Sequence, residues 1–289
     1  MNAPDPIDDA ELERRFGGLR RLYGDAGYAR LRAAHVAVVG LGGVGSWAVE
    51  ALARCGVAGL VLIDFDHVAE SNINRQVQAL GRTLGQAKGE ALRERIADIH
   101  PGCEVRCIDD FVEPGNWPAL LGAPVDLLID ACDQVRAKLA LAAWGLAQRV
   151  PLVCVGAAGG KRLAQRVEVE DLADVTHDPL LASLRTRLRK EAAAPRQGRI
   201  GLRCVFSRES VARPVAAAAA APLDDDVSVA CAADASSSVD GNLNCRGYGS
   251  SVAVTATFGM VAASEAICLL LAEPSAAQAG KSAEMLSII

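Results

Sequence analysis

Short apolar runs alternate with helix-like stretches through the first half of the chain. Five runs predict buried strands: 35–40, 60–64, 104–108, 126–130 and 151–156. The spacing of apolar residues between them predicts helices over 44–56, 88–99 and 136–149. Continuously apolar strands alternating with helices are typical of a mostly parallel sheet covered by helices on both faces. The pattern therefore predicts an α/β fold.

The second half is less regular. Residues 177–190 predict another helix, with basic residues toward its end. Residues 252–272 are apolar with one charge, Glu265, but they consist largely of small side chains, so we expect a buried helix and no membrane span. The Ala-, Ser- and Asp-rich segment at about 211–240 is expected to be a mobile surface insertion.

Composition narrows the classes of function. The 289 residues carry a net charge of −5, so any nucleic-acid surface would have to be local. Nine scattered cysteines without a CxxC pair argue against a disulfide framework and against zinc, and they fit reduced thiols in the cytoplasm. The acidic N-terminus contains no apolar stretch, so no signal peptide is predicted.

A glycine motif follows the first predicted strand and opens a helix. In Gly40-Leu-Gly-Gly-Val-Gly45, Gly40 permits a tight turn, Gly42 lets a phosphate approach the backbone, and Gly45 lets the helix pack closely on the strand. Asp64 ends the next strand, where a carboxylate can accept ribose hydroxyls. The motif predicts a Rossmann-like nucleotide site, and by itself it fits a dinucleotide as well as ATP.

Charged residues after the motif favour ATP. Arg75 and Lys88 would converge on the phosphate end, where a hydride-transfer enzyme has no need of them. An adenylating enzyme must neutralise a triphosphate during attack on the α-phosphorus, and it needs a carboxylate for Mg²⁺. Asp130, which ends a later strand in Asp130-Ala-Cys-Asp133, is our expected carboxylate.

These residues carry a resemblance. The Gly40–Gly45 motif, the stretch 64–76, Lys88 and the segment 130–133 resemble the adenylation domain of the ubiquitin-activating-type superfamily, which includes the molybdopterin-synthase and thiamine sulfur-carrier adenylyltransferases. Over most of the chain the sequence is similar to the tRNA threonylcarbamoyladenosine dehydratases. The similar stretches are 14–24, 40–57, 62–80, 85–96, 109–112, 150–160, 178–190, 204–209 and 254–263.

The resemblance implies roles for individual residues. Phosphate and ribose would be bound by Gly40, Gly42, Gly43, Gly45, Asp64, Asp66, Asn72, Arg75, Gln76, Lys88 and Asp130, with Asp130 holding Mg²⁺. Arg75, Lys88 and Asp130 would be catalytic. The implied organisation is an N-terminal helical segment (1–34), a nucleotide-binding core (35–160) and an irregular, substrate-binding C-terminal part (161–289) packed on the same domain.

Two departures from the family pattern matter. The sulfur-carrier adenylyltransferases supply an arginine from an N-terminal Arg-Gln pair, often from the partner subunit, whereas this chain has Gly17-Gly18 there. That role is open to Arg15, Arg20 or Arg21. The paired zinc cysteines of those enzymes are absent, which favours the dehydratases and predicts no zinc.

A thiol and a basic stretch complete the candidates. Cys245 lies beside Arg246 in a glycine-rich loop and is a candidate nucleophile, although it could equally be an inert loop residue. Between 185 and 208 there are eight basic residues and one acidic residue, a pattern usual for a solvated face. The tRNA substrate that the resemblance implies favours an RNA phosphate surface instead. The eight basic residues are Arg185, Arg187, Arg189, Lys190, Arg196, Arg199, Arg203 and Arg208.

The leading hypothesis is ATP-dependent dehydration of N6-threonylcarbamoyladenosine in tRNA. The threonyl carboxylate would be adenylated with release of pyrophosphate, and an internal oxygen would then close a ring on the activated carbonyl with loss of AMP. The alternatives are activation of the C-terminus of a ubiquitin-like or sulfur-carrier protein, and a nucleotide-binding regulator. The resemblance further implies a homodimer, a cysteine desulfurase or sulfur-acceptor system as partner, and no membrane.

Overall fold

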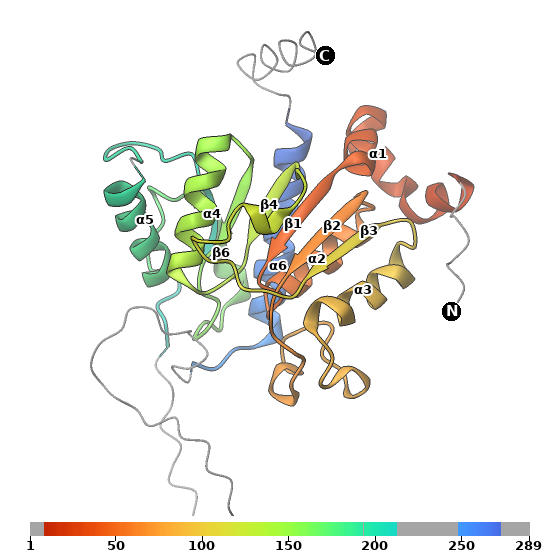
Figure 1. The fold of residues 1–289 in the computed structure, drawn as a ribbon, viewed down its shortest axis with the longest axis horizontal. Helices are drawn as coiled ribbons and strands as arrows, with labels where there is room; N and C mark the ends of the chain where they lie inside the picture. The colour runs from red at the N-terminus through yellow and green to blue at the C-terminus, as the bar shows by residue number, and fades with distance from the viewer. Residues whose placement is uncertain (1–8, 193, 213–247, 273–289) are drawn as a thin grey trace, which may run out of the picture.

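The computed structural model describes residues 9–192, 194–212 and 248–272 (Figure 1). Most of the expected insertion at about 211–240, and Cys245, lie outside the described residues. The prediction of mobility for the insertion therefore stays a prediction.

Seven strands form one sheet in the order β3-β2-β1-β4-β5-β7-β6. Their bounds are β1 His35–Val39, β2 Gly59–Ile63, β3 Glu104–Ile108, β4 Leu127–Asp130, β5 Leu152–Val155, β6 Val167–Asp171 and β7 Arg203–Ser207. All neighbours are parallel except the antiparallel pair β6 and β7. The five predicted strands and the mostly parallel sheet are confirmed. The two further strands come from the C-terminal part, which therefore continues the same sheet.

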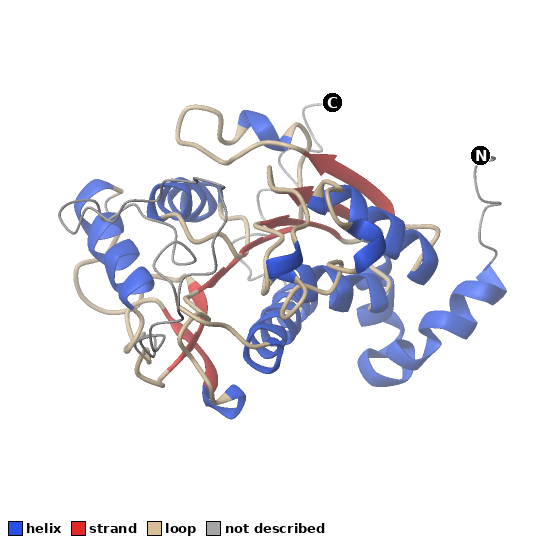
Figure 2. Cartoon of the chain, turned by 90° about the horizontal axis from the view of Figure 1, so that it is seen from below, coloured by secondary structure: helices blue, strands red, loops and turns tan. Residues whose placement is uncertain are grey.

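Helices cover both faces of the sheet (Figures 1 and 2). One face carries α2 (Gly45–Arg54), α3 (Lys88–Ile99) and α6 (Val252–Leu271), and the other carries α4 (Val135–Gln148) and α5 (Pro179–Glu191). Alternation within a strand divides the core, since Val36 and Val38 face the first group while Ala37 and Val39 face the second. Short 3-10 turns lie at η1 (Glu70–Asn72), η2 (Gly81–Thr83), η3 (Ala119–Leu121) and η4 (Ala164–Arg166).

Helix α6 packs on the sheet along one side, as the sequence predicted. Phe258 and Ala262 are fully buried, and Gly259 lies so close to α2 that a Cβ atom there would be 2.5 Å from the Val44 carbonyl oxygen. Among the described residues α6 is the one helix long and apolar enough to cross a membrane, and 44% of its most apolar window is buried in the protein. Its small residues thus serve close packing of helix on helix.

The N-terminal helix α1 (Asp9–Ala33) is anchored on the side of the sheet where the parallel strands begin. Arg15 donates to the carbonyl oxygens of Asp98 and Ile99 at the end of α3. The fully buried His100 accepts from Arg32 at 2.8 Å and packs its ring 4.8 Å from that of Phe16. This side of the sheet lies opposite the strand ends that carry the glycine motif.

The strand order reverses between β1 and β4. The chain proceeds from β1 outward to β2 and β3, and then returns to β4 on the other side of β1. In open α/β sheets, ligands bind outside the carboxyl ends of the strands at such a switch point. The fold therefore places the candidate site at the ends of β1 and β4.

Candidate active site

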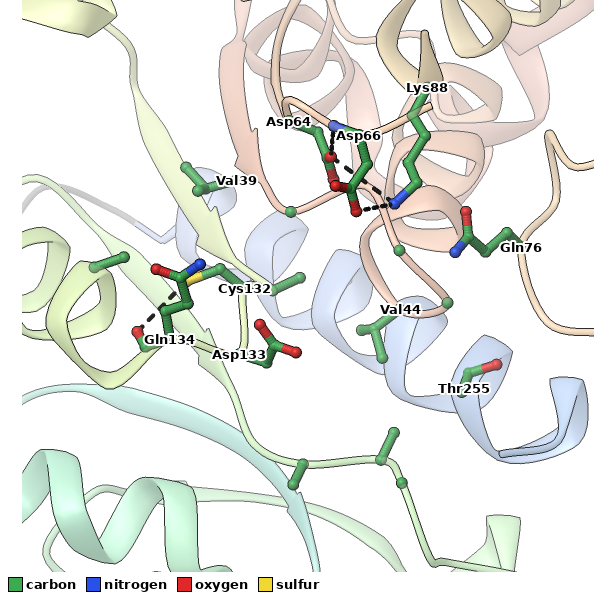
Figure 3. A pocket seen from close by; sticks show the side chains of 18 of the residues that line it. Val39, Val44, Asp64, Asp66, Gln76, Lys88, Cys132, Asp133, Gln134 and Thr255 are labelled. Carbon is green, nitrogen blue, oxygen red and sulfur yellow. Dashed lines mark hydrogen bonds and ion pairs between the residues drawn. The ribbon is translucent and has the colours of Figure 1, made fainter. Parts of the chain in front are cut away.

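A cleft opens at this switch point, and its volume is about 1270 Å³ when the solvent space at its open mouth is included. Its walls come from residues within 39–44, 63–66, 75–76, 110–112, 131–134 and 156–159, joined by Lys88, Leu180, Tyr248, Ser250 and Thr255. Most of these segments follow the carboxyl end of a parallel strand or begin a helix. Most of the predicted nucleotide residues therefore meet in one place (Figure 3).

The glycine motif has the geometry that its spacing predicted. Gly40 has φ +86°, and a Cβ atom there would lie 2.8 Å from the backbone of Ala131. Gly45 packs so closely under Gly40 that a Cβ atom would overlap its carbonyl oxygen. At Gly42, by contrast, a Cβ atom would have no neighbour within 4 Å, because that residue faces the open cleft. The turn and the start of α2 thus leave room for phosphate against the backbone.

Asp64 ties the end of β2 to the glycine motif. Its carboxylate accepts from the backbone N–H of Leu41 at 2.6 Å and from that of Asp66 at 2.8 Å. Burial raises the pKa of Asp64, against the opposing effects of Lys88 and of these two hydrogen bonds. Asp64 therefore lies in the cleft, at the position where a carboxylate that binds the ribose hydroxyls is predicted.

Lys88 begins α3 and points into the cleft with Asp64 and Asp66 (Figure 3). Its amino group lies 2.7 Å from the Asp66 carboxylate and 3.9 Å from that of Asp64. The side chain of Lys88 is 6% exposed whereas that of Asp66 is 57% exposed. A buried cation held by a solvated carboxylate is suited to exchange that partner for a phosphate.

Arg75 and Gln76 line the cleft, but Asn72 does not. Arg75 donates to the carbonyl oxygens of Ser71 and of the Asn74 side chain, at 2.7 and 3.0 Å, and burial lowers its pKa. The Asn72 side chain instead accepts from the backbone N–H of Ala69 at 3.1 Å and shapes turn η1. Asn72 therefore positions the turn that carries Arg75, and its predicted contact with phosphate stays a prediction.

The two carboxylates of the segment 130–133 lie in different surroundings. Asp130 is fully buried, its carboxylate lies 3.1 Å from the fully buried amino group of Lys138, and it is not among the cleft residues. As the last residue of β4 it belongs to the sheet, whereas Asp133, three residues later, extends into the cleft (Figure 3). Burial raises the pKa of Asp133, opposed by Lys138. Of the two carboxylates only Asp133 is among the residues that line the cleft, and the role of Asp130 as metal ligand stays a prediction.

The wall opposite the glycine motif comes from the segment after β5. Residues 156–159 line the cleft. The Asp178 side chain accepts from the backbone N–H of Ala157 at 2.8 Å. It also caps α5 by accepting from the backbone N–H of Leu181. Lys161, buried next to this wall, donates to the carbonyl oxygens of His177 and Ser207. No role was predicted for this wall from the sequence.

Two exposed aromatic rings stand at the nucleotide end. Phe111 lines the cleft beyond β3, and its ring centroid is 5.0 Å from that of Phe65, which follows Asp64. The exposed fractions are 43% for Phe111 and 49% for Phe65. Exposed aromatic side chains beside a ribose site offer a face for a base.

The basic stretch 185–208 is largely engaged within the protein. Arg185 donates to the carbonyl oxygens of Leu172 and Val175, Arg203 pairs with Glu265 at 2.6 Å, and Arg208 pairs with Glu168 at 2.7 Å. Arg189 donates to the carbonyl oxygen of Pro195, and Arg199 lies 4.0 Å from Asp171.

Most of this stretch is also remote from the cleft. Helix α5 begins near Leu180, which lines the cleft. Ten residues of helix span about 15 Å, so Lys190 lies toward the side of the sheet opposite the cleft. Arg203 begins β7, which is parallel to β5, and is on that same side. Arg208 alone of the eight follows the end of a strand at the cleft edge.

The comparisons decide the family. Residues 17–287 match the ThiF family. The chain belongs to the ThiF family. The tRNA threonylcarbamoyladenosine dehydratase of Escherichia coli K12 is 42% identical over 270 residues, which are 92% of this chain and 97% of that protein. The dehydratase of Haemophilus influenzae is 39% identical over 91% of this chain.

A solved structure extends this ThiF-family match to the fold. The E. coli tRNA N6-threonylcarbamoyladenosine dehydratase in complex with ATP has a TM-score of 0.78 and 40% identity, covering 92% of this chain and 97% of that one. The E. coli molybdopterin-synthase adenylyltransferase is 38% identical over 44% of this chain. The resemblance to both groups, and the Rossmann-like fold, are confirmed.

Proposed function

We propose that this chain is an ATP-dependent tRNA threonylcarbamoyladenosine dehydratase, which adenylates the threonyl carboxylate and closes a ring with loss of AMP. The observation that carries the proposal is a cleft in which the glycine motif, Asp64, Lys88 and Arg75 face one space. This set of groups suits a nucleoside triphosphate, because it offers backbone N–H groups and two cations for the phosphates and a carboxylate for the ribose hydroxyls. Similarity over nearly the full length of dehydratases supports the same reaction.

The cleft suggests how ATP lies. The ribose would meet Asp64 and the adenine would lie against Phe111. The phosphates would cross Gly42 toward Lys88 and Arg75, which places the α-phosphorus near the middle of the cleft. Asp133 would hold Mg²⁺ on the phosphates, because Mg²⁺ is commonly bound by one or two carboxylates together with substrate phosphates. A metal ion held there by Asp133 would supply charge stabilisation to the leaving pyrophosphate.

The substrate carboxylate would approach from the opposite wall, residues 156–159. Adenylation replaces a poor leaving group, water, by a good one, AMP. The internal oxygen and the activated carbonyl belong to one side chain of the modified nucleoside, so ring closure gains from proximity. Cys245 lies outside the described residues, and its role as nucleophile remains part of the proposal.

A homodimer is part of the proposal as well. Within one protomer α1 is anchored near the end of α3, whereas Lys88 begins that helix at the cleft. An N-terminal arginine would therefore reach ATP from the partner. Arg15 and Arg20 are ion-paired to Glu11 and to Asp25, whereas no ion pair of Arg21 is found among the described residues, so we assign the role to Arg21. A cytoplasmic location is supported by the scattered cysteines, which are free thiols among the described residues. A cysteine desulfurase or sulfur-acceptor partner rests on the resemblance alone.

The second candidate is activation of a ubiquitin-like or sulfur-carrier protein, which the similarity to the molybdopterin-synthase adenylyltransferase favours. One experiment separates the two. Purified protein is incubated with ATP, Mg²⁺ and tRNA with or without the threonylcarbamoyl group, or with a carrier protein ending in Gly-Gly, and pyrophosphate release is measured. Release only with the modified tRNA supports the dehydratase, and release only with the carrier protein overturns it.

A further inference from the structure

A fully buried ion pair lies directly beneath the nucleotide cleft. The amino group of Lys138 is 3.1 Å from the Asp130 carboxylate, and both side chains are 0% exposed. Lys138 also donates to the backbone carbonyl oxygen of Asp130 at 3.3 Å. Two charges in the interior carry a large desolvation cost, so such a pair is weak evidence of a contribution to stability. Its location suggests a different role.

The Asp130 carboxylate fixes the backbone that enters the cleft. It accepts from the backbone N–H of Cys132 at 3.2 Å and from the thiol of the same residue at 2.9 Å. Its other oxygen accepts from the Cys154 thiol on the adjacent strand at 3.4 Å. Cys132 belongs to the segment 131–134, whose members line the cleft and include Asp133.

The same segment supports the glycine motif. A Cβ atom on Gly40 would be 2.8 Å from the Ala131 carbonyl carbon and 2.8 Å from the Cys132 backbone nitrogen. A Cβ atom on Gly45 would be 3.3 Å from that of Ala131. The motif therefore rests on the 131–132 peptide, and a shift of this peptide would move phosphate-binding backbone and Asp133 together.

We propose that Asp130 and Lys138 are positioning residues for the nucleotide site, and that they act by holding the segment 131–134 against the glycine motif. Lys138 neutralises the carboxylate, and the carboxylate orients the peptide. The inference rests on the proposed function only in requiring that the cleft binds ATP.

The test separates positioning from folding. Replacing a buried ion pair by apolar residues of similar volume is often neutral for stability, so the double variant Asp130→Leu/Lys138→Met should fold. It removes every hydrogen bond from the Asp130 side chain to the segment. The variant Asp130→Asn/Lys138→Met is also neutral but keeps an acceptor oxygen for the Cys132 backbone N–H. A matched control is Asp171→Asn, because Asp171 is a buried carboxylate that accepts from three backbone N–H groups at the opposite edge of the sheet.

Two quantities are measured on each full-length variant: the Kd of ATP by calorimetry and the thermal midpoint Tm. We expect ATP binding to weaken at least tenfold in Asp130→Leu/Lys138→Met, since a displacement of about 1 Å can cost about 100-fold in a preorganised site. We expect Asp130→Asn/Lys138→Met to recover much of this loss, and Asp171→Asn to bind ATP normally even where its Tm falls.

The outcomes are distinct. Failure of the unaltered protein to bind ATP would overturn the proposed function and this inference with it. Normal ATP binding by Asp130→Leu/Lys138→Met would overturn the inference alone. The inference would also be overturned if Asp171→Asn weakened ATP binding as much as Asp130→Leu/Lys138→Met does at the same loss of Tm. Should the leucine variant fail to fold, the asparagine variant still decides, because a Kd weakened by more than tenfold with the acceptor retained contradicts the proposed hydrogen-bond anchor.

Discussion

The amino group of Lys88 lies 2.7 Å from the carboxylate of Asp66 at the mouth of the nucleotide cleft. Lys88 is nearly buried while Asp66 is largely solvated, so the cation is fixed and its partner can be replaced. A triphosphate entering the cleft would compete with Asp66 for that cation. The pair thus keeps a positive charge at the phosphate end without leaving it unpaired in the free protein.

Lys88→Ala should abolish pyrophosphate release while leaving the fold intact. The side chain stabilises charge that develops on the phosphates, and the loss of one such group costs on the order of 100-fold in rate. Single-turnover pyrophosphate release measures the effect. Arg93→Ala on the exposed side of the same helix, where Arg93 pairs with Glu90, is the control and should keep its rate. A near-normal rate for Lys88→Ala would remove this residue from the site.

Asp133→Asn should shift the Mg²⁺ dependence of the reaction. Asp133 is the cleft carboxylate on the segment after β4, so its loss would raise the Mg²⁺ concentration needed for half-maximal rate by about tenfold or more. Titration of Mg²⁺ at saturating ATP measures the shift. Asp110→Asn, at the aromatic end of the cleft, should leave the Mg²⁺ dependence unchanged. An unchanged dependence in Asp133→Asn would place the metal elsewhere.

The strands and the glycine motif were predictable because local signals specify them. Continuous apolar runs identified β1 and β4, and the roles predicted for Gly40 and Gly45 follow from spacing alone. Strands β6 and β7 were missed, because β6 alternates valine with acidic residues at the sheet edge and β7 has only three consecutive apolar residues between a polar residue at each end. Their pairing depends on contacts distant in the chain, which a local pattern does not contain.

Of the two carboxylates in the segment 130–133, the sequence points to Asp130 as the metal ligand, whereas the structure places Asp133 in the wall of the cleft. Asp130 is the last residue of an apolar run and turns into the core, whereas Asp133 stands in the following loop, where functional residues concentrate. The buried cation that makes the inward turn tolerable, Lys138, lies on the next helix. A local motif contains no information about this contact, so the pairing of Asp130 with Lys138 could not be predicted from it.

We expect mixed dimers to recover activity that two variants lack separately. If Arg21 of one protomer completes the cleft of its partner, Lys88→Ala and Arg21→Ala should each be nearly inactive. Equal mixing after subunit exchange should restore about a quarter of the rate, because half of the dimers are mixed and each has one intact site. Pyrophosphate release measures this. No recovery with exchange verified by light scattering would mean that Arg21 acts within its own protomer or not at all.

Stability should fall between pH 6.5 and pH 4 because of His100. Burial, together with Arg32 and Arg15, lowers the pKa of His100 from 6.5 to about 4. The unfolded chain binds this proton at a higher pH than the folded chain does. Its contribution is therefore complete above pH 6.5 and is lost as the pH falls toward 4, by about 3 kcal/mol.

Urea unfolding of the unaltered protein and of His100→Asn between pH 4 and 7 measures this loss. The variant should show a shallower decline in the free energy of unfolding than the unaltered protein. His67→Asn, an exposed residue, should follow the unaltered protein. Parallel curves for His100→Asn and the unaltered protein would contradict the assignment.

The RNA surface should lie at the cleft edge and not along most of the basic stretch 185–208. The exposed Arg162 and Arg166 stand where β5 ends and β6 begins, on the same edge as the cleft wall 156–159, whereas Arg189 donates to Pro195 far along α5. An arginine that binds an RNA phosphate displaces counterions, so its removal should flatten the slope of log affinity against log salt by roughly 0.7 to 0.9. Charge reversal at Arg162 and Arg166 should therefore flatten the slope for modified tRNA by roughly 1.5 and leave ATP affinity unchanged.

The matched charge reversal at Arg187 and Arg189 should change the slope less. Filter binding across a salt series measures both slopes, and a larger effect at Arg187 and Arg189 would place the RNA surface on the basic stretch 185–208. No salt dependence with tRNA in any variant would point instead to a protein substrate.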